Sequence, residues 1–400
     1  MRASSWRCPK AWCGPSVIRS AVVRMSGSYQ TASRRKPTLA CSQPRPIDCS
    51  STDRIKLAVR AKANSSMKFP SLFEHVPATI SEISSRTIPA AAVEIVRRAS
   101  AVRFVAMGGS YNAASAAVEA FLARDVDARA ELASHLLHVE SVTAKHSEAI
   151  VFISQSGTSV ETIRAAERLR ALGYSNLICI TNNVDSDLAR ACDVVIDQAL
   201  TKQMRVPFGP WIATYTTLVR LAGLRAGQPE ADWDSAAEAA RSALGQLHEV
   251  VALAPVAPAY VEFFGRGAFR ATAEQGTLIV REIARVPASA WDSSTYRHGP
   301  IEAISPSQLS IVFAASQGRA AQLDRAFAAA LREIVSDVIV VGPEDADVPI
   351  RADDEIAALV SILAAAFLAY TWGESAGLTI GEFRYTSHSV TDEDTLVLGN

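Results

Sequence analysis

The sequence predicts an α/β protein made of two consecutive doubly wound parallel sheets of the flavodoxin-like type. Short runs that are apolar throughout alternate with helical patterns, which is typical of parallel strands covered by helices on both faces. The order of elements starts again after Gly227-Gln228-Pro229, so we expect two similar units in tandem. A hydroxyl-rich loop follows one strand at the sheet edge where such folds bind ligands.

The first unit is predicted from about residue 80 onward. The alanine-rich segment 90–99 is expected to be a helix, VRFVAM at 102–107 a buried strand, and 111–123 a helix that follows a Gly-Gly-Ser turn. Then come a strand at 149–154, a helix over 159–171, a strand at 176–181, a short helix near 185–190, a strand at 193–196 and a long helix over about 210–226.

The second unit repeats this order. We expect a helix near 234–253, the strand AYVEFF at 259–264 and a helix over 270–284, then strands at 309–314, 336–341 and 348–350 and helices over 319–334 and 354–376. The predicted domains are a basic extension over 1–66, a first sheet domain over 67–229 and a second over 230–400.

Residues 1–66 differ in composition from the rest of the chain. They hold thirteen Lys or Arg and two acidic residues, whereas the remainder holds 27 basic and 39 acidic residues. Such a segment is typical of an organellar targeting peptide or of a basic arm that touches nucleic acid, and it can also be translated sequence upstream of a start at Met67. We favour the last interpretation and expect no nucleic-acid partner.

The cysteines indicate neither a metal site nor disulfides. Four of the six lie within 1–66 without paired zinc-ligand spacing, while Cys179 and Cys192 lie in or beside apolar strands as small hydrophobic residues. The chain has no run of eighteen apolar residues. We therefore expect a cytoplasmic protein without a membrane partner, a metal or a cofactor.

The most informative segment is VFISQSGTS at 151–159, a buried strand that leads through hydroxyls and a glycine into a helix. A helix N-terminus presents unpaired backbone N–H groups and partial positive charge, so it favours an anion. The neutral donors of this loop are Ser154, Gln155, Ser156 and Ser159. Together they suit a phosphate monoester. A simple Ser or Thr helix cap is the alternative, although one hydroxyl suffices for a cap.

The second unit has fewer hydrogen-bond donor side chains at the matching point, Ala315-Ser316-Gln317-Gly318, so we expect a single phosphate site. Neither glycine turn, at 108–113 or at 265–270, completes G-x-G-x-x-G, and no ribose-binding acid stands at the expected distance. A Walker pattern is also missing. We therefore expect no nucleotide cofactor.

Two side chains are candidates for proton transfer. His298 precedes Gly299-Pro300, and because proline disfavours a helical residue before it, the histidine is expected on a loop rather than in the core. Glu282 lies near the end of the helix predicted over 270–284. Alone it would be a solvated helix residue, but with a loop histidine and a phosphate site it becomes a candidate base.

In these motifs the chain resembles the sugar isomerase (SIS) domain family of phosphosugar-binding proteins, over about residues 80–393. It looks most like the isomerase half of glucosamine-6-phosphate synthase and the related deaminases that lack a glutaminase half. Gly109-Ser110-Tyr111-Asn112 matches the turn whose serine contacts substrate, and Ser154-Gln155-Ser156-Gly157 with Ser159 matches the phosphate loop. The resemblance places Glu282 on the catalytic glutamate and His298 on the ring-opening histidine, which the neighbouring subunit supplies.

The chain departs from the synthase at three positions. Gln275 and Ile279 stand in place of a glutamate and a lysine, and His388 replaces the lysine expected just before Ser389-Val390-Thr391. In the synthase that last lysine forms a Schiff base with the ketose, so the resemblance does not carry this covalent route over to the chain. His388 is retained as a candidate catalytic residue.

The resemblance implies an amino-sugar-phosphate deaminase and isomerase that converts glucosamine 6-phosphate to fructose 6-phosphate and ammonia, as a homodimer with shared active sites. We expect no glutaminase reaction, since no such segment precedes the sheets. A fructosamine-phosphate deglycase is the alternative enzyme. A non-catalytic phosphosugar-binding regulator is the alternative from another class, but residues 1–66 show no helix-turn-helix pattern.

Overall fold

The structure is a computed structural model that describes residues 71–138, 147–200, 208–228, 231–385 and 390–392. The chain divides into two units, Met1–Cys49 and Ser50–Asn400, and all described residues belong to the second unit. The basic extension predicted over 1–66 and the candidate residue His388 therefore lie outside the described residues.

The first sheet has five parallel strands in the order β2-β1-β3-β4-β5. They are β1 (Ala101–Ala106), β2 (Ala128–Leu132), β3 (Glu148–Ile153), β4 (Leu177–Thr181) and β5 (Val194–Asp197). The strands β1 and β4 are buried along their whole length, and β3 is buried except at its first residue. Their apolar runs are thus covered on both faces, as expected for a parallel sheet.

The helices of this part are α2 (Ser71–Glu74), α3 (Val76–Ser85), α4 (Ala90–Arg98), α5 (Gly108–Leu122), α6 (Ala133–His138), α7 (Val160–Ala171), α8 (Asp187–Ala191) and α9 (Phe208–Ala226). Helix α9 is buried along most of its length because α3, α4 and α5 pack against it. A helix that is apolar nearly all round requires such a covered position.

The second sheet also has five parallel strands, in the order β10-β9-β8-β6-β7. They are β6 (Val261–Gly265), β7 (Ala288–Asp292), β8 (Leu309–Phe313), β9 (Asp337–Gly342) and β10 (Val348–Pro349). Counted within its own half, each sheet has the strand order 2-1-3-4-5, which is that of flavodoxin-like sheets.

The helices of this second part include two of unusual type. The α-helices are α10 (Trp233–Gly245), α11 (Leu247–Leu253), α12 (Ala268–Ile279), α13 (Ser293–Tyr296), α14 (Gly318–Arg332), α15 (Asp354–Val360) and α16 (Ile362–Ser375). A π-helical turn, η2 (Val280–Ala284), continues α12, and a 3-10 helix, η3 (Pro300–Ala303), precedes β8.

Every strand predicted from the sequence is present, and the α/β class with parallel sheets is confirmed. The strands β2 and β7 were not predicted. Both lie at the edge of their sheets and are half-exposed in part, with the sequences ARAEL and ASAWD. An edge strand needs no continuous apolar run, so the pattern typical of buried strands is missing there.

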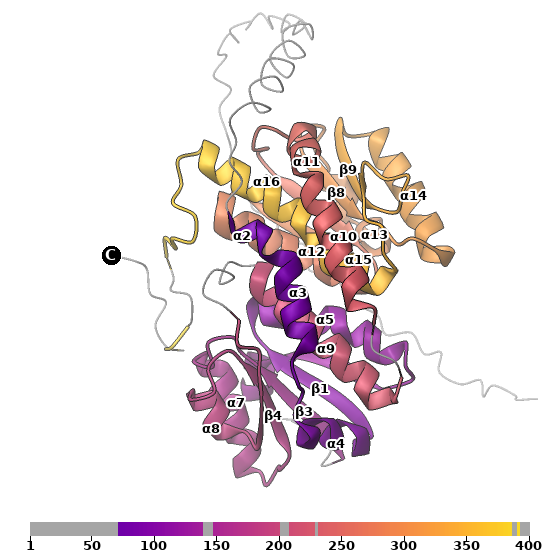
Figure 1. Cartoon of the computed structure of the whole chain (residues 1–400). Coiled ribbons are helices and arrows are strands. Elements are labelled where there is room, and N and C mark those ends of the chain that lie inside the picture. Colours follow the sequence, from indigo (N-terminus) through magenta and orange to yellow (C-terminus); the bar gives the residue numbers. More distant parts are fainter. Residues whose placement is uncertain (1–70, 139–146, 201–207, 229–230, 386–389, 393–400) are drawn as a thin grey trace, which may run out of the picture. The chain divides into compact units, whose positions relative to one another are not determined.

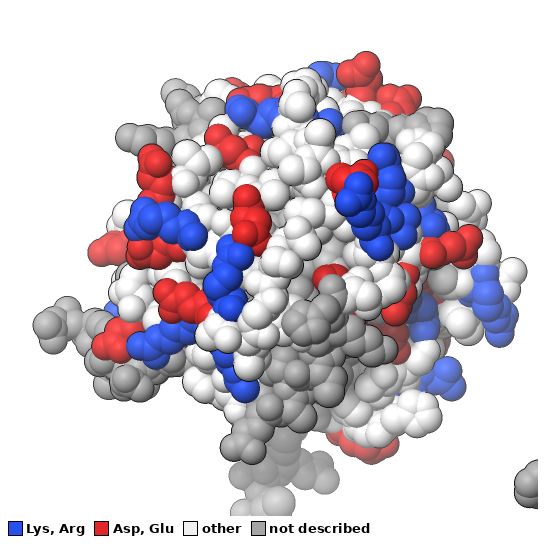
Figure 2. Space-filling view, turned by 90° about the horizontal axis from the view of Figure 1, so that it is seen from below, with Lys and Arg blue, Asp and Glu red and all other residues white. Residues whose placement is uncertain are grey.

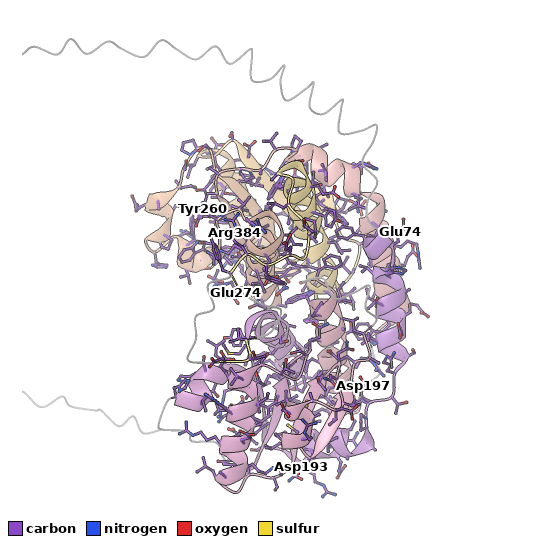
Figure 3. The ribbon with its side chains drawn as sticks, turned by 90° about the vertical axis from the view of Figure 1, so that its left-hand side faces the viewer. Glu74, Asp193, Asp197, Tyr260, Glu274 and Arg384 are labelled. Atoms are coloured by element: carbon purple, nitrogen blue, oxygen red, sulfur yellow. The ribbon has the colours of Figure 1, made fainter. Side chains whose placement is uncertain are left out.

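The two sheets are joined through α5 and α12, which lie between them in Figure 1. The Asn112 side chain on α5 donates a hydrogen bond to Gln275 Oε1 on α12 at 3.0 Å, and both side chains are buried. At the other end of α5, Arg124 makes two hydrogen bonds to the Glu355 carboxylate. Polar contacts thus fix α5 against the second sheet's helices at both ends. In Figure 3, Tyr260 and Glu274 mark the part of the chain that holds the second sheet, and Asp193 and Asp197 mark the part that holds the first sheet.

The segment Asp354–Ser375 is long and apolar enough to cross a membrane, but 94% of its apolar window is buried inside the protein. It comprises α15 and α16, which pack against α9, α10 and α12. The two helices of this segment therefore belong to the core of the protein. The surface is of mixed charge on the face in Figure 2, where basic and acidic side chains are interspersed.

Candidate functional site

The predicted phosphate loop connects β3 to α7, and its hydroxyls converge. Gly157 has a φ of +68°, and its N–H donates to the Ser154 carbonyl at 3.1 Å and lies 3.2 Å from Ser154 Oγ. The Ser154 and Ser159 Oγ atoms are 3.2 Å apart. The turn at Gly157 therefore brings together two serines that are five residues apart in the sequence.

The first turn of α7 receives no cap from the side chain at its N-terminus. Ser159 occupies the N-cap position without a side-chain hydrogen bond to the helix, whereas Ser186, at the N-cap of α8, accepts from the Ala189 N–H. Ser159 therefore leaves the start of α7 without a side-chain cap. A twelve-residue helix without a side-chain cap offers backbone N–H groups and partial positive charge to an anion, although its first N–H, that of Val160, is bonded to the Val390 carbonyl.

Gln155 supplies a further donor to this loop. Its main-chain carbonyl is held by the N–H of Asn182 at 2.9 Å and by the Thr181 hydroxyl at 3.3 Å. Its Nε2 atom is buried and has no hydrogen-bond partner among the described residues. An unpaired buried amide costs about 1–3 kcal/mol, so this donor is consistent with a ligand that accepts from it.

The matching loop of the second sheet is filled by the protein's own carboxylates. The N–H of Ala315 donates to Asp324 Oδ2 at 3.3 Å, and the N–H of Ser316 donates to Asp354 Oδ1 at 2.7 Å. Asp324 is fully buried and also pairs with Arg266. The second loop thus presents these two backbone donors to internal acids.

Ser110 lies in the first turn of α5, close to the same edge of the first sheet. The strand β1 that precedes α5 pairs with β3 up to Ala106 opposite Ile153, so α5 and the phosphate loop begin side by side. A Cβ atom on Gly109 would come within 3.2 Å of Gln275 Oε1 and 3.5 Å of Leu278 Cδ2. This first turn of α5 therefore packs against the last turns of α12.

Glu282 follows on the π-helical turn η2, one turn beyond Leu278. Burial raises the pKa of its carboxyl to about 7, because the charged form loses water without gaining a partner. Among the described residues the Glu282 side chain makes no hydrogen bond or ion pair. π-helical turns occur frequently at functional sites, and this turn carries Glu282, the residue predicted as a proton-transfer base.

The C-terminal segment connects the Glu282 turn with the phosphate loop. Near its start, the Glu382 carbonyl accepts from Arg285 Nη2 at 3.3 Å, just after η2. Near its end, the Val390 carbonyl accepts from the Val160 N–H at 3.0 Å, at the first residue of α7. Figure 1 shows this segment in yellow, leaving α16. The sequence comparison pointed to the tail, but nothing in the sequence indicated that its backbone meets α7.

His298 lies on an exposed turn after α13, as predicted, and its N–H donates to the Thr295 carbonyl at 2.9 Å. Among the described residues no hydrogen bond or ion pair joins it to Glu282, and the flanking contacts place the two at opposite ends of β7. Arg281, next to Glu282, donates to the carbonyl of Ala288 at the start of β7, whereas His298 lies beyond the end of β7. A five-residue strand spans ~13 Å at 3.3 Å per residue, which separates the two candidates.

Neither a lysine nor a metal-binding cluster occurs among the described residues. After residue 70 the sequence has two lysines, Lys145 and Lys202, and both lie outside the described ranges. The described residues contain no group of three or more His, Cys, Asp or Glu that could hold a metal ion.

Comparisons with known proteins relate the part of the chain that holds the first sheet to a protein family. Residues 95–223, which span the first sheet and its loop, match the family model described as the SIS domain. A glutamine–fructose-6-phosphate aminotransferase (isomerizing) from Aliivibrio fischeri is 27% identical over 241 residues, covering 56% of this chain and 39% of the relative. The chain thus spans about two fifths of the length of that relative. The predicted resemblance is confirmed.

Two solved structures share the fold over most of their length. The C-terminal domain of glucosamine-fructose-6-phosphate aminotransferase from Francisella tularensis has a TM-score of 0.64 and 20% identity, covering 77% of this chain and 96% of that one. A glucosamine-6-phosphate deaminase from Thermotoga maritima has a TM-score of 0.68 and 17% identity, covering 80% of this chain and 99% of that one. At these identities the likeness concerns the fold.

Proposed function

Residues 95–223 carry a SIS domain, and on this premise we propose that the protein is a phosphosugar aldose–ketose isomerase of the amino-sugar class. Its substrate is glucosamine 6-phosphate, which it converts with water to fructose 6-phosphate and ammonia. The proposal is supported by relatives named as isomerizing glutamine–fructose-6-phosphate aminotransferases and by a fold neighbour named as a glucosamine-6-phosphate deaminase.

The 6-phosphate is bound by the loop between β3 and α7. The proposed ligands are Ser110, Ser154, Gln155, Ser156 and Ser159. Support comes from the start of α7, which has no side-chain cap, and from the buried Gln155 Nε2 atom, which has no hydrogen-bond partner in the part of the chain that the structure describes. Each helix-end contact to an anion contributes about 0.3–1 kcal/mol, and up to ~2 kcal/mol where it is partly buried.

Ring opening is assigned to His298 of the partner subunit. This histidine moves a proton between the ring oxygen and O1, which yields the open-chain aldehyde. Support for a shared site comes from the separation of Glu282 and His298 along β7 within one chain. A homodimer in which each subunit completes the other's site removes that separation.

Proton transfer is assigned to Glu282. Its carboxylate takes the proton from C2 of the open-chain sugar and returns it to C1, while a proton passes from the C2 amine to O1, so that C1 becomes an alcohol and the C2 amine becomes an imine. Water then adds to C2, the C–N bond breaks and ammonia leaves, which gives fructose 6-phosphate. No lysine is needed for this sequence.

The observation that carries the proposal is the environment of Glu282. A pKa of about 7 leaves the carboxyl able both to accept and to return a proton near neutral pH, and general acid–base catalysis is most efficient under that condition. Because the deprotonated form is the base, kcat/KM is expected to fall on the acid side of pH 7.

The test is turnover of glucosamine 6-phosphate by the full chain, with fructose 6-phosphate and ammonia measured together. We expect equal amounts of the two products and a loss of ~10²–10⁴-fold in kcat for Glu282→Gln, with sugar-phosphate binding retained. The matched control is Glu333→Gln, at an exposed glutamate that follows α14, and it should keep wild-type kcat.

Other outcomes separate the alternatives. Turnover of a fructosamine phosphate in place of glucosamine 6-phosphate would identify a deglycase. Binding of the sugar phosphate without any turnover, and without an effect of Glu282→Gln, would contradict an enzymatic role and identify a sensor.

A further inference from the structure

The turn that carries His298 is anchored at both ends to one buried carboxyl group, that of Glu262. This residue lies on β6 and is 5% exposed. Tyr296, two residues before His298, donates its hydroxyl to Glu262 Oε2 at 2.5 Å. Gln308, which follows the turn, donates Nε2 to the same oxygen at 2.7 Å. The chain between the two donors is the segment 297–307.

The remaining contacts of Glu262 extend this anchoring. The Trp291 Nε1–H on β7 donates to Glu262 Oε1 at 3.2 Å. The Gln308 side chain in turn accepts from the Ser305 N–H at 3.0 Å, which ties the chain just after η3. All donors to the carboxyl are neutral, and Glu262 makes no ion pair among the described residues.

Tyr296 is suited to act as a fixed anchor. Its ring is fully buried and packs edge-on against Phe264 with ring centroids 4.8 Å apart, and it also contacts Phe327. Burial, with the hydrogen bond to Glu262, holds the pKa of the Tyr296 phenol above its usual range, so the hydroxyl remains a donor. By contrast His298 itself is exposed and Gly299 has a φ of +139°.

A buried carboxyl that accepts from neutral donors alone is a poor way to stabilise a fold, since apolar packing achieves the same without desolvating a carboxyl. The hydrogen bonds to Glu262 do, however, fix one position for a turn that is otherwise exposed. We propose that Glu262 and Tyr296 are positioning residues that hold the His298 turn in the geometry needed for ring opening. This inference rests on the proposed function, because it gives His298 a part in turnover.

The first test measures the turn itself and needs no activity. Amide hydrogen exchange is followed at His298, Glu302 and Ile304, whose N–H groups are hydrogen-bonded within the turn. Tyr296→Phe keeps the buried ring and removes the anchor, and we expect these amides to exchange at least ~10-fold faster. Glu262→Gln is the second variant and should act in the same direction.

Tyr260→Phe is the matched control for this test. It removes a hydroxyl from the residue just before β6, where Tyr260 donates to Ser289 Oγ at 2.6 Å, and leaves the donors to Glu262 in place. It should leave exchange in the turn unchanged. Exchange in Tyr296→Phe that is no faster than in Tyr260→Phe overturns the inference, whatever the activity.

The second test is kinetic. Tyr296→Phe should lower kcat by ~10–100-fold because a misplacement of about 1 Å has an effect of this size, while KM changes less than about threefold because the phosphate loop lies on the other sheet. Added to His298→Ala, it should cause no further loss, since it acts through His298.

The kinetic outcomes also separate the two proposals. Wild-type protein without turnover refutes the proposed function, and the exchange measurement still decides the anchoring. An active wild type in which Tyr296→Phe keeps its kcat, or adds its full effect to His298→Ala, overturns the positioning role alone.

Discussion

At the scale of single residues, the most unusual feature is Glu282, an acid that is mostly buried and has no partner among the described residues. Proteins pair or hydrogen-bond buried carboxylates because an unpaired charge is costly in a medium of low polarity. A carboxyl without a partner among the described residues is what the proposed role of Glu282 as a proton-transfer base calls for.

This trade predicts a pH-dependent stability. The unfolded chain loses the Glu282 proton near the ordinary pKa of 4.5 and the folded chain near 7, so the folded state binds more protons in between and stability falls as pH rises through that window. Glu282→Gln should therefore be more stable than wild type at pH 8, by roughly 3 kcal/mol, and nearly equal to it at pH 4.

Urea unfolding at fixed protein concentration measures this difference, because association would otherwise shift the midpoint. The exposed Glu302→Gln is the control and should show no such trend between pH 4 and pH 8. Equal stability of wild type and Glu282→Gln at pH 8 would contradict the burial of an uncompensated charge.

At the scale of elements, the loop between β3 and α7 depends on Gly157. Its φ of +68° is a conformation that residues with a side chain rarely adopt. A Cβ atom there would overlap the Ser186 side chain, which caps α8 and is buried. The glycine thus lets α8 and the phosphate loop approach each other closely.

Gly157→Ala is expected to destabilise the protein by about 2–4 kcal/mol, through positive-φ strain together with displacement of the Ser186 cap. It should also raise KM for the sugar phosphate, because the loop must move. Thermal unfolding and steady-state kinetics measure the two effects.

Gly173→Ala is the matched control for this prediction. Gly173 also has a positive φ, +84°, but a Cβ atom there meets nothing within 4 Å. The control should cost about 1 kcal/mol and leave KM unchanged. Equal effects of the two variants would show that the contact with Ser186 has no part in shaping the loop.

At the scale of the whole molecule, the proposed site draws on both sheets. The first sheet supplies the phosphate loop and the start of α5, and the second supplies Glu282 on η2. Helices α5 and α12 hold these parts against each other through Asn112 and Gln275. The C-terminal segment touches both parts, at Arg285 and at Val160.

Shared sites predict complementation between inactive variants. Glu282→Gln and His298→Ala subunits, unfolded together and refolded as a mixture, should regain up to about a quarter of wild-type activity, because half of the random dimers are mixed and each mixed dimer has one intact site. Each variant refolded alone is the control. Failure to regain activity, with mixed dimers demonstrated by mass, would argue for self-contained sites.

The sequence by itself determined the α/β class, the buried strands, the hydroxyl-rich loop between β3 and α7 and the loop position of His298. Each follows from local signals: an apolar run, hydroxyls before a helix, and a proline after Gly299. It also determined which residues are candidates, since Glu282 and His298 could be aligned with a family pattern. The burial of a whole strand and the conformation of a turn depend mainly on residues that are neighbours in the sequence, so no tertiary information is needed to predict them.

Only the tertiary structure decided the edge strands, the π-helical turn and the partners of the polar groups. The strands β2 and β7 form because a neighbouring strand offers hydrogen bonds. Their half-exposed sequences carry no pattern that predicts this pairing. The raised pKa of Glu282, the carboxylates that fill the second loop, and the Glu262 anchor each depend on residues far apart in the chain. Burial and hydrogen bonding between distant segments are properties of packing, and a linear pattern does not contain them.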